Sequence, residues 1–364
     1  MKGKQGLVCM GLLLVLSSCH TGKQITASGL QRKDFQTEVN GQHTDLFTLS
    51  NKQGMEVCIT NYGARVVSIL VPDRNGKRED VVCGFSTITE YMEQRQNFGS
   101  TVGRYIGRIL NARFTLDGVE YKLVPNNGKS GHISHGGNPG FADRIWKVEQ
   151  ADTHRVRLSY LSPDGENGFP GNLKVTLVYS LGEDDNALDL TYEATTDAPT
   201  VLNLSHHSFF NISGNFTKSV EDQQLWVDAD RFTPYDDKKC VTGEYLPVAG
   251  TPLDFRMPHT IGECIDADHP QLKVVNGYDH IWELNTKGDD TRPAAWVYDP
   301  ASGRKMEIFT TEPGMQIYTG NGLKGKMTGK GGIAYPFRSA VCFETMHFQD
   351  SPNQPGFPST VLRP

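Results

Sequence analysis

The sequence predicts an all-β fold, a large sandwich of antiparallel β-sheets, and three observations lead to this prediction. Apolar and polar residues alternate with a period of two from about residue 37 onward. Gly and Pro are abundant, with 38 and 19 residues among 364, as many short strands joined by turns require. Helical periodicity is sparse, and no internal repeat of fixed period indicates a propeller or a solenoid.

Short alternating segments separated by turn residues define the expected strands. In residues 174–181, for example, Val175, Leu177 and Tyr179 point to one face of the strand. The expected strands are residues 56–59, 65–71, 155–160, 174–181, 187–195, 305–311, 316–319 and 339–345.

Residues 36–364 are expected to form a single domain, because no interior linker rich in Pro, Ser or charge divides them. The one expected helix covers residues 86–94, with Ser86 as its N-cap. Residues 19–35 are polar and lack apolar periodicity, which predicts a flexible tether before the domain.

The first residues have the pattern of a bacterial lipoprotein signal peptide. Lys2 and Lys4 precede an apolar run of roughly ten residues, too short for the ~20 residues of a transmembrane helix. The run ends in LSSC, which resembles the motif whose cysteine receives a lipid after cleavage. We therefore expect residues 1–18 to be removed and Cys19 to be lipidated. The protein would be exported and anchored in the periplasm or cell envelope through this lipid alone; an ordinary secretory signal cut elsewhere is the alternative.

Composition limits the partners and the redox chemistry. The formal net charge is −6 and no long Lys/Arg run occurs, which argues against nucleic acid as a partner. Without Cys9 and Cys19, five of the seven cysteines remain, an odd number without CxxC spacing. We therefore expect neither a disulfide framework nor a zinc site. The sequence leaves open whether Cys240 and Cys264 pair.

Histidines supply the first candidates for chemistry. No nucleotide, metallopeptidase or serine-hydrolase motif occurs, which favours a mechanism without a cofactor or a metal. In NLSHHSFFN, His206 and His207 precede two aromatic residues, and imidazole exchanges protons near neutral pH. His132 and His135 lie among glycines, which would let a ligand approach the backbone. Histidines held by backbone carbonyls beside a core are the alternative for the first segment.

Charged residues in apolar or glycine-rich settings are further candidates. Glu344 shares a face of its expected strand with small residues, which leaves room for a ligand. Asp279 has aromatic neighbours, and Arg104 and Arg108 carry forked donors suited to hydroxyl and carboxylate oxygens. An exposed strand carboxylate, a turn residue and surface ion pairs are the corresponding alternatives.

Several motifs occur in order from about Phe47 to Pro364: GRYIGRI, SHGG, GFADRIW, SPDGENGFPG, HHSFFN, GYDHIW, PGMQIYTGN, CFET and NQPGFPSTVLRP. In these motifs the chain resembles the aldose 1-epimerase, or galactose mutarotase, family. The resemblance implies a large β-sandwich of the mutarotase supersandwich type with an open carbohydrate cleft. It also implies interconversion of the α and β anomers of a free hexose such as glucose or galactose, without a cofactor.

The resemblance assigns roles to the candidate residues. It makes Glu344 the general base on the C1 hydroxyl and His207 the general acid at the ring oxygen. The residues expected to hold sugar hydroxyls are Arg108, His135, Asp279 and Gln316. The aldose is the expected small-molecule partner of a monomeric protein, and neither cofactor nor metal is expected.

Three departures from the family pattern bear on sugar preference. Gly107 stands where Asn often precedes the arginine, His206 where Asn is common, and Phe209 where Tyr is common. Two other functions compete with the epimerase: a carbohydrate hydrolase or lyase that uses Asp279 and Glu344 as a carboxylate pair, and a sugar-binding lipoprotein without catalysis.

Overall fold

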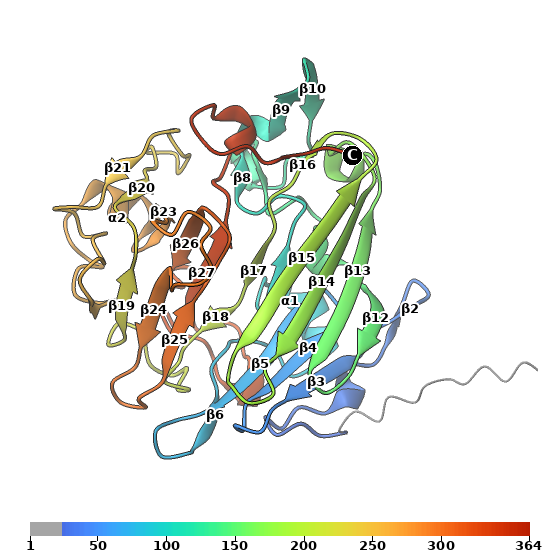
Figure 1. Ribbon diagram of the computed structural model, residues 1–364, viewed down its shortest axis with the longest axis vertical. Coiled ribbons are helices and arrows are strands. Elements are labelled where there is room, and N and C mark those ends of the chain that lie inside the picture. Colours follow the sequence, from blue (N-terminus) through green and yellow to red (C-terminus); the bar gives the residue numbers. More distant parts are fainter. Residues whose placement is uncertain (1–23) are drawn as a thin grey trace, which may run out of the picture.

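The computed structural model describes residues 24–364, which form mainly β-strands with two short α-helices among them (Figure 1). The expected signal peptide, residues 1–18, and Cys19 lie outside the described residues. Within residues 24–364, no helix has both the length and the apolar character needed to cross a membrane.

Two four-stranded antiparallel sheets form the N-terminal half of the molecule. The first has the order β3 (Leu46–Ser50), β4 (Glu56–Thr60), β5 (Arg65–Pro72), β6 (Arg78–Asp80). The second has the order β12 (Lys147–Ala151), β13 (Arg155–Ser162), β14 (Leu173–Leu181), β15 (Leu188–Thr196). Val57 and Ile59 share one buried cluster with Val175, Leu177 and Tyr179. The predicted face of β14 is therefore buried, and the strand prediction is confirmed there.

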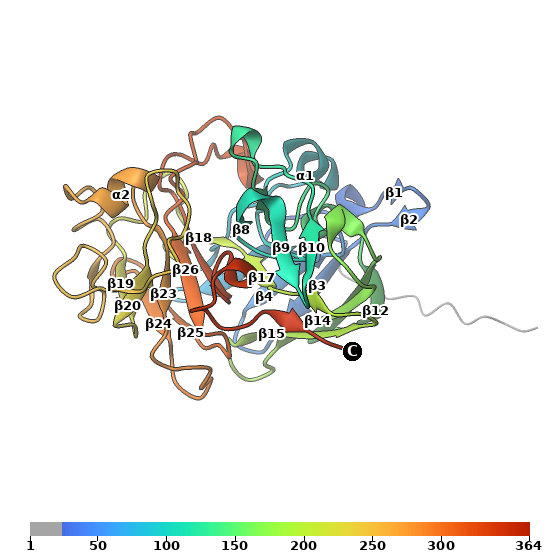
Figure 2. The same cartoon turned by 90° about the horizontal axis from the view of Figure 1, so that it is seen from above.

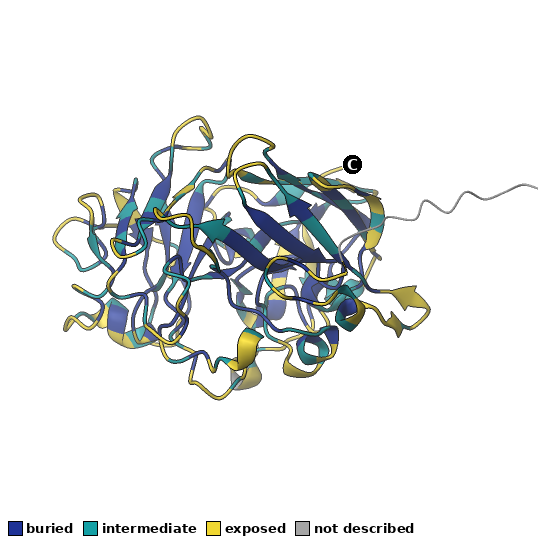
Figure 3. Ribbon diagram, turned by 90° about the horizontal axis from the view of Figure 1, so that it is seen from below, coloured by how far each residue is buried: buried dark blue, intermediate teal, exposed yellow. Residues whose placement is uncertain are grey.

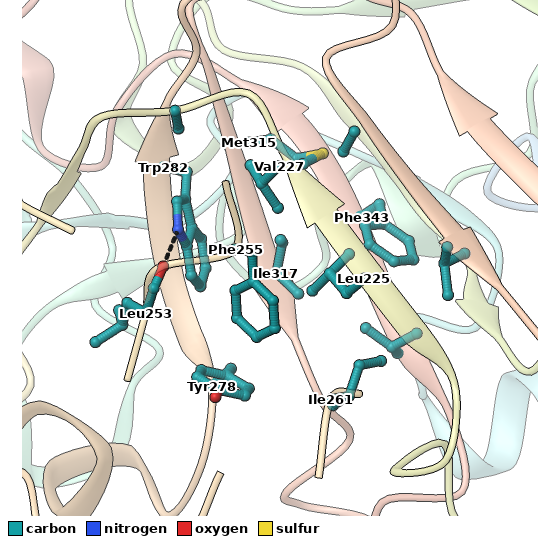
Figure 4. Packing of buried hydrophobic residues seen from close by; sticks show 14 of the residues in the cluster. Leu225, Val227, Leu253, Phe255, Ile261, Tyr278, Trp282, Met315, Ile317 and Phe343 are labelled. Atoms are coloured by element: carbon teal, nitrogen blue, oxygen red, sulfur yellow. Dashed lines mark hydrogen bonds between the residues drawn. The ribbon is translucent and has the colours of Figure 1, made fainter. Parts of the chain in front are cut away.

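The C-terminal half contains a six-stranded antiparallel sheet and a four-stranded one. The larger has the order β18 (Phe209–Phe210), β27 (Val341–Met346), β26 (Gly314–Tyr318), β23 (Asp279–Glu283), β20 (Arg231–Thr233), β21 (Leu246–Pro247). The smaller has the order β22 (His259–Thr260), β19 (Gln224–Val227), β24 (Ala295–Tyr298), β25 (Lys305–Ile308). Leu225 and Val227 pack in one buried cluster with Trp282, Ile317 and Phe343 of the larger sheet (Figure 4).

Five two-stranded pairs complete the sheets of the described residues. They are β1 (Glu38–Val39) with β2 (Gln42–His43), β7 (Ser100–Val102) with β17 (Ser205–His207), β8 (Arg108–Ile109) with β11 (Ile133–Ser134), β9 (Arg113–Leu116) with β10 (Val119–Lys122), and β16 (Thr200–Val201) with β28 (Val361–Leu362). Strand β17 lies between the two halves in both cartoon views (Figures 1 and 2). Buried residues lie mainly in the strands, and exposed residues lie mainly in the loops (Figure 3).

The expected helix begins two residues later than the predicted range 86–94, and its N-cap lies one residue later. Helix α1 spans Ile88–Gln94, and its N-cap is Thr87 rather than Ser86. Thr87 Oγ1 accepts the backbone N–H of Glu90, while the Glu90 carboxylate accepts the N–H groups of Ser86 and Thr87. This reciprocal capping box fixes the first turn. A second helix, α2 (Pro270–Val275), was not expected from the sequence and begins with Pro270 at its first position.

Single turns of 3₁₀ helix join many of the strands. They are η1 (Arg32–Phe35), η2 (Leu110–Ala112), η3 (Gly128–Ser130), η4 (Phe141–Asp143), η5 (Glu166–Gly168), η6 (Lys330–Gly332) and η7 (Ser351–Asn353).

Residues 24–35 pack against the domain, so the prediction of a flexible tether is wrong for this part. Leu30 is 5% and Phe35 0% exposed, and both belong to a buried cluster. The N–H of Ala27 donates to the carboxylate of Glu56 at 2.7 Å. Two apolar anchors in a polar segment are enough to hold it, although they give no periodic pattern.

The five described cysteines are Cys58, Cys83, Cys240, Cys264 and Cys342, and all are free thiols. Cys240 and Cys264 therefore do not pair, and Cys240 instead lies 3.3 Å from His132 Nε2.

Candidate active site

Three of the predicted site residues lie on one face of the six-stranded sheet. Strands β23, β26 and β27 are neighbours, and Gln316 pairs with Glu344 in the register of β26 and β27. Asp279 pairs with Tyr318, two residues along β26 from Gln316. Because alternate residues of a strand share a face, Asp279, Gln316 and Glu344 gather on the same side. This set of polar residues is called the polar face below.

The carboxylates of the polar face are held in a buried setting. Glu344 is 2% exposed, and burial raises its pKa well above the usual range, with the charge of Asp279 adding to the rise. Gln316 Nε2 donates to Asp279 Oδ1 at 2.5 Å. Burial raises the pKa of Asp279, whereas the charge of Arg108 and this hydrogen bond lower it. The Glu344 alternative, an exposed strand carboxylate, is excluded by the 2% exposure.

His207 faces Glu344 from strand β17. Its Nε2 lies 3.4 Å from Glu344 Oε1, and its ring stacks on Phe209 at 5.1 Å between centroids. The side chain is only 6% exposed, and burial lowers its pKa to about 4. A neutral imidazole thus stands beside a carboxyl group whose protonated form is favoured, which is a geometry for proton exchange.

Arg108 begins strand β8, and His135 directly follows the paired strand β11. The N–H of His135 donates to the carbonyl of Gly107 at 2.9 Å, one residue before Arg108. The ring centroid of His135 lies 5.7 Å from that of His207. Burial, together with the charges of His207 and Arg108, lowers the pKa of His135 to about 3.

The structure therefore brings together all six residues singled out by the resemblance. Glu344, His207 and Gln316 are buried. Arg108, His135 and Asp279 are half-buried and form the outer part of the same site.

Three other candidates from the sequence do not join this site. Arg104 is 2% exposed, and its guanidinium donates to backbone carbonyls, including that of Pro170 at 2.8 Å. His206 Nε2 lies 2.7 Å from Ser208 Oγ, on the side of β17 away from Glu344. His132 Nδ1 accepts the N–H of Asn111 at 2.9 Å. The local sequence pattern marked the two His-rich segments, but it did not distinguish the site histidine from its neighbour within each segment.

The glycines beside the site make room for other parts of the chain. A Cβ on Gly136 would lie 2.0 Å from the carbonyl oxygen of Gly103. A Cβ on Gly107 would lie 2.5 Å from Gln349 Cγ. The prediction that the glycines around His135 open the backbone to a ligand is therefore wrong at Gly136, and both Gly136 and Gly107 instead permit close packing of protein on protein.

His207, Cys342 and Glu344 offer a nitrogen, a sulfur and an oxygen within 4.8 Å of one another. Burial raises the pKa of the Cys342 thiol well above its usual value, so the sulfur keeps its proton beside the imidazole and the carboxyl group. The expectation of no metal stays a prediction.

Two residues of the site were missed by the sequence analysis. Gln349 Nε2 donates to Gln316 Oε1 at 2.8 Å and to the hydroxyl of Tyr235 at 3.0 Å. No motif marked either residue. The only signal was indirect: Gly107 lacks a side chain where the family pattern often has one, and Gln349 fills the adjoining space.

The fold and the site define a class of protein, an all-β acid–base enzyme for a small molecule rich in hydroxyl groups. The imidazole and carboxyl pair exchanges protons, while the guanidinium, amide and second carboxylate offer hydrogen bonds to neutral oxygens. The model of one family, described as aldose 1-epimerase, matches residues 45–364. The chain belongs to the aldose 1-epimerase family.

Named relatives and solved structures agree with this assignment. The chain is 39% identical to galactose mutarotase of Sus scrofa, over 87% of this chain and 90% of that protein. It is 36% identical to aldose 1-epimerase of Escherichia coli K12, over 89% of this chain and 93% of that protein. A crystal structure of an aldose epimerase homologue from C. elegans superposes with a TM-score of 0.81 at 31% identity, covering 88% and 95% of the two chains.

These findings confirm two predictions. The fold is the all-β sandwich of the galactose mutarotase-like structures. The protein is an isomerase that interconverts the anomers of an aldose.

Proposed function

We propose that the substrate is a free hexose of the glucose or galactose type, and that Glu344 and His207 exchange the two protons that its anomerisation needs. One proton leaves the C1 hydroxyl while another reaches the ring oxygen, and the ring opens. Rotation about C1–C2 presents the other face of the carbonyl, and reclosure gives the other anomer. The observation that carries the proposal is the buried pair itself, with Nε2 and Oε1 3.4 Å apart.

In the proposed direction of opening, Glu344 takes the C1 hydroxyl proton and His207 protonates the ring oxygen. Burial alone favours the opposite charge state, with a protonated Glu344 and a neutral His207. Both states hold one proton between the two residues. A sugar hydroxyl that donates to the carboxylate stabilises its ionised form, so substrate binding shifts the shared proton toward His207. On reclosure the two roles reverse.

The other four residues are proposed to bind the sugar. Arg108 donates to hydroxyl oxygens, and the Asp279 carboxylate accepts from hydroxyl groups. Gln316 holds Asp279 in place through the 2.5 Å hydrogen bond. His135 places a second imidazole 5.7 Å from His207, beside the site proposed for the ring oxygen.

Exchange spectroscopy by NMR on a mixture of anomers tests this assignment. Glu344→Gln and His207→Asn are each expected to slow anomer exchange by about 10²–10⁴-fold, the worth of one positioned proton transfer. Glu307→Gln makes the same chemical change on β25, where Glu307 pairs with Lys305 at 2.7 Å in solvent, and should keep the wild-type rate.

Anomer exchange in these variants, together with an assay for reducing ends, distinguishes the epimerase from the two competing functions. Equal exchange rates in all variants, with sugar binding retained, would make the protein a non-catalytic binder. An oligosaccharide that gains reducing ends while fresh α-glucose gains no acceleration would favour a hydrolase that uses Asp279 and Glu344.

We also propose that the protein is an exported, monomeric lipoprotein of the periplasm or cell envelope, cleaved after residue 18 and anchored through Cys19. The signal pattern of residues 1–19 supports this proposal. In the native host, Cys19→Ala should move the protein from the membrane fraction to the soluble fraction and abolish labelling by a radioactive fatty acid. Labelling that survives this substitution contradicts the anchor. Light scattering of the released protein checks the monomer.

A further inference from the structure

Gln349 lies beside Gln316 of the polar face and contacts it through its side-chain amide. It follows strand β27 in the chain and is 2% exposed. Its Nε2 group donates to Gln316 Oε1 at 2.8 Å and to the Tyr235 hydroxyl at 3.0 Å. We propose that Gln349 is a positioning residue that fixes the Gln316 amide and, through it, the Asp279 carboxylate. It thereby sets the affinity for the sugar and determines which sugar hydroxyls are bound. The inference rests on the proposed binding roles of Gln316 and Asp279.

The direction of the hydrogen bonds explains why this position needs an amide. An ionised Asp279 only accepts, so Gln316 must present its NH₂ group to that carboxylate. The carbonyl oxygen of Gln316 then faces the other way and needs a donor. Gln349 supplies this donor, and both amides are buried, so water is a poor substitute. The chain of donors from Gln349 through Gln316 to Asp279 therefore runs in one direction only.

Gly107 and Gln349 form a complementary pair. Gly107 has a φ of +76°, and a Cβ at this position would lie 2.5 Å from Gln349 Cγ and 3.0 Å from its Cδ. A side chain at position 107 and the observed rotamer of Gln349 cannot coexist. Gln349 thus brings an amide, from a distant part of the chain, next to the space that a side chain preceding Arg108 would take. The close approach of Gln349 therefore gives a physical reason why position 107 is glycine where the family pattern often has Asn.

The variant Gln349→Glu keeps the shape of the side chain and, in its ionised form, has no donor. Two oxygens would then face each other, the Gln316 amide would turn, and Asp279 would lose its partner. We expect KM for glucose and galactose to rise by about tenfold, the factor of one buried hydrogen bond, with a much smaller change in kcat. The proton-exchanging pair of Glu344 and His207 is not contacted by this amide in any hydrogen bond of the described residues.

A matched control separates positioning from a merely structural role. Gln223 is also 2% exposed and donates its Nε2 group to Asn211 Oδ1 at 2.7 Å, outside the site. Gln223→Glu is expected to lower the Tm as Gln349→Glu does, but to leave KM unchanged. An equal KM in wild type and Gln349→Glu would overturn the proposal.

Rescue gives a second test. Gln349→Ala removes the amide, and Gly107→Asn alone forces the Gln349 side chain out of its position, so each should raise KM. Asn tolerates a positive φ better than most residues. Gly107→Asn combined with Gln349→Ala is therefore expected to bind sugar more tightly than either single variant. A double variant that is no better than Gln349→Ala contradicts the proposal.

The outcome is independent of the catalytic assignment. The dissociation constants of glucose and galactose, measured by NMR titration, report the same effect as KM. If the wild type binds sugar but exchanges no anomers, the catalytic proposal fails while the binding constants still decide the role of Gln349. If the wild type exchanges anomers and Gln349→Glu binds as tightly, only the inference fails.

Discussion

The six-stranded sheet has two faces with opposite properties, although the same strands β23, β26 and β27 supply both. One is the polar face of Asp279, Gln316 and Glu344. The other is an apolar face, formed by the adjacent residues His280, Ile317 and Phe343 together with Trp282. Trp282, Ile317 and Phe343 pack against Leu225 and Val227 of β19 (Figure 4). Trp282 Nε1 donates to the carbonyl of Leu253 at 3.0 Å, so the indole N–H on that face is satisfied.

The difference teaches that a strand separates catalysis from packing by one residue. Because successive side chains point to opposite faces, Phe343 packs β27 against the core while Glu344 faces His207 on the other side. The rigid apolar face holds the spacing of the polar face, and substitutions on the two faces should therefore affect different measurements.

The largest expected effect on the apolar face comes from Phe343→Ala. Removing this buried ring should lower the free energy of unfolding by about 3–5 kcal/mol, as urea denaturation followed by tryptophan fluorescence would measure. The anomer-exchange rate of the folded protein should stay close to wild type. Glu344→Gln, at the adjacent position, should have the reverse effect: the anomer-exchange rate falls while the free energy of unfolding is unchanged. An exchange rate as low in Phe343→Ala as in Glu344→Gln would show that the faces are not independent.

A smaller effect is expected from pH, through the one histidine named on the apolar face. His280 is 0% exposed, and burial lowers its pKa to about 3 from the ordinary value of 6.5. Below pH 6.5 the unfolded chain takes up a proton that the folded chain does not, so stability is lost as the pH falls toward 3. The loss is about 1.4 kcal/mol per pH unit for one such group. His280→Phe should lose this part of the acid sensitivity between pH 6.5 and 5, measured by urea denaturation at each pH. An unchanged pH dependence would refute the assignment.

The smallest effects are expected from a neighbouring pair on β26. Gln316→Ala leaves Asp279 without its amide partner and should raise KM by roughly tenfold with little change in the free energy of unfolding. Ile317→Val, one residue further on the apolar face, should cost about 0.5–1.5 kcal/mol of stability and leave KM unchanged. Steady-state kinetics and urea denaturation of both variants check the pair, and a KM raised equally by Ile317→Val would contradict the separation of the faces.

Alternation in the sequence was sufficient to predict several of the strands and the sides of their residues, but not β23 (Asp279–Glu283), which carries Asp279. It assigned Val175 and Leu177 to a buried face, and it placed Glu344 opposite Phe343, both of which the structure confirms. The period of two is a local property, and burial of one face enforces it strongly.

What the sequence lacked was information about distant contacts. The fit between Gly107 and Gln349 joins positions far apart in the chain, and neither residue has a local pattern that signals it. His206 and His207 are adjacent and chemically identical, and only the neighbours of β17 separate them, Ser208 for one and Glu344 for the other. The ordered motifs of the family distinguished these histidines where composition did not.

The packing of residues 24–35 on the domain has a consequence for how the enzyme would sit in the cell. If Cys19 carries the lipid, only residues 20–23 separate it from the first described residue. A chain of this length reaches at most about 18 Å, even fully extended. The catalytic domain would then be held close to the membrane surface and not at the end of a long flexible linker.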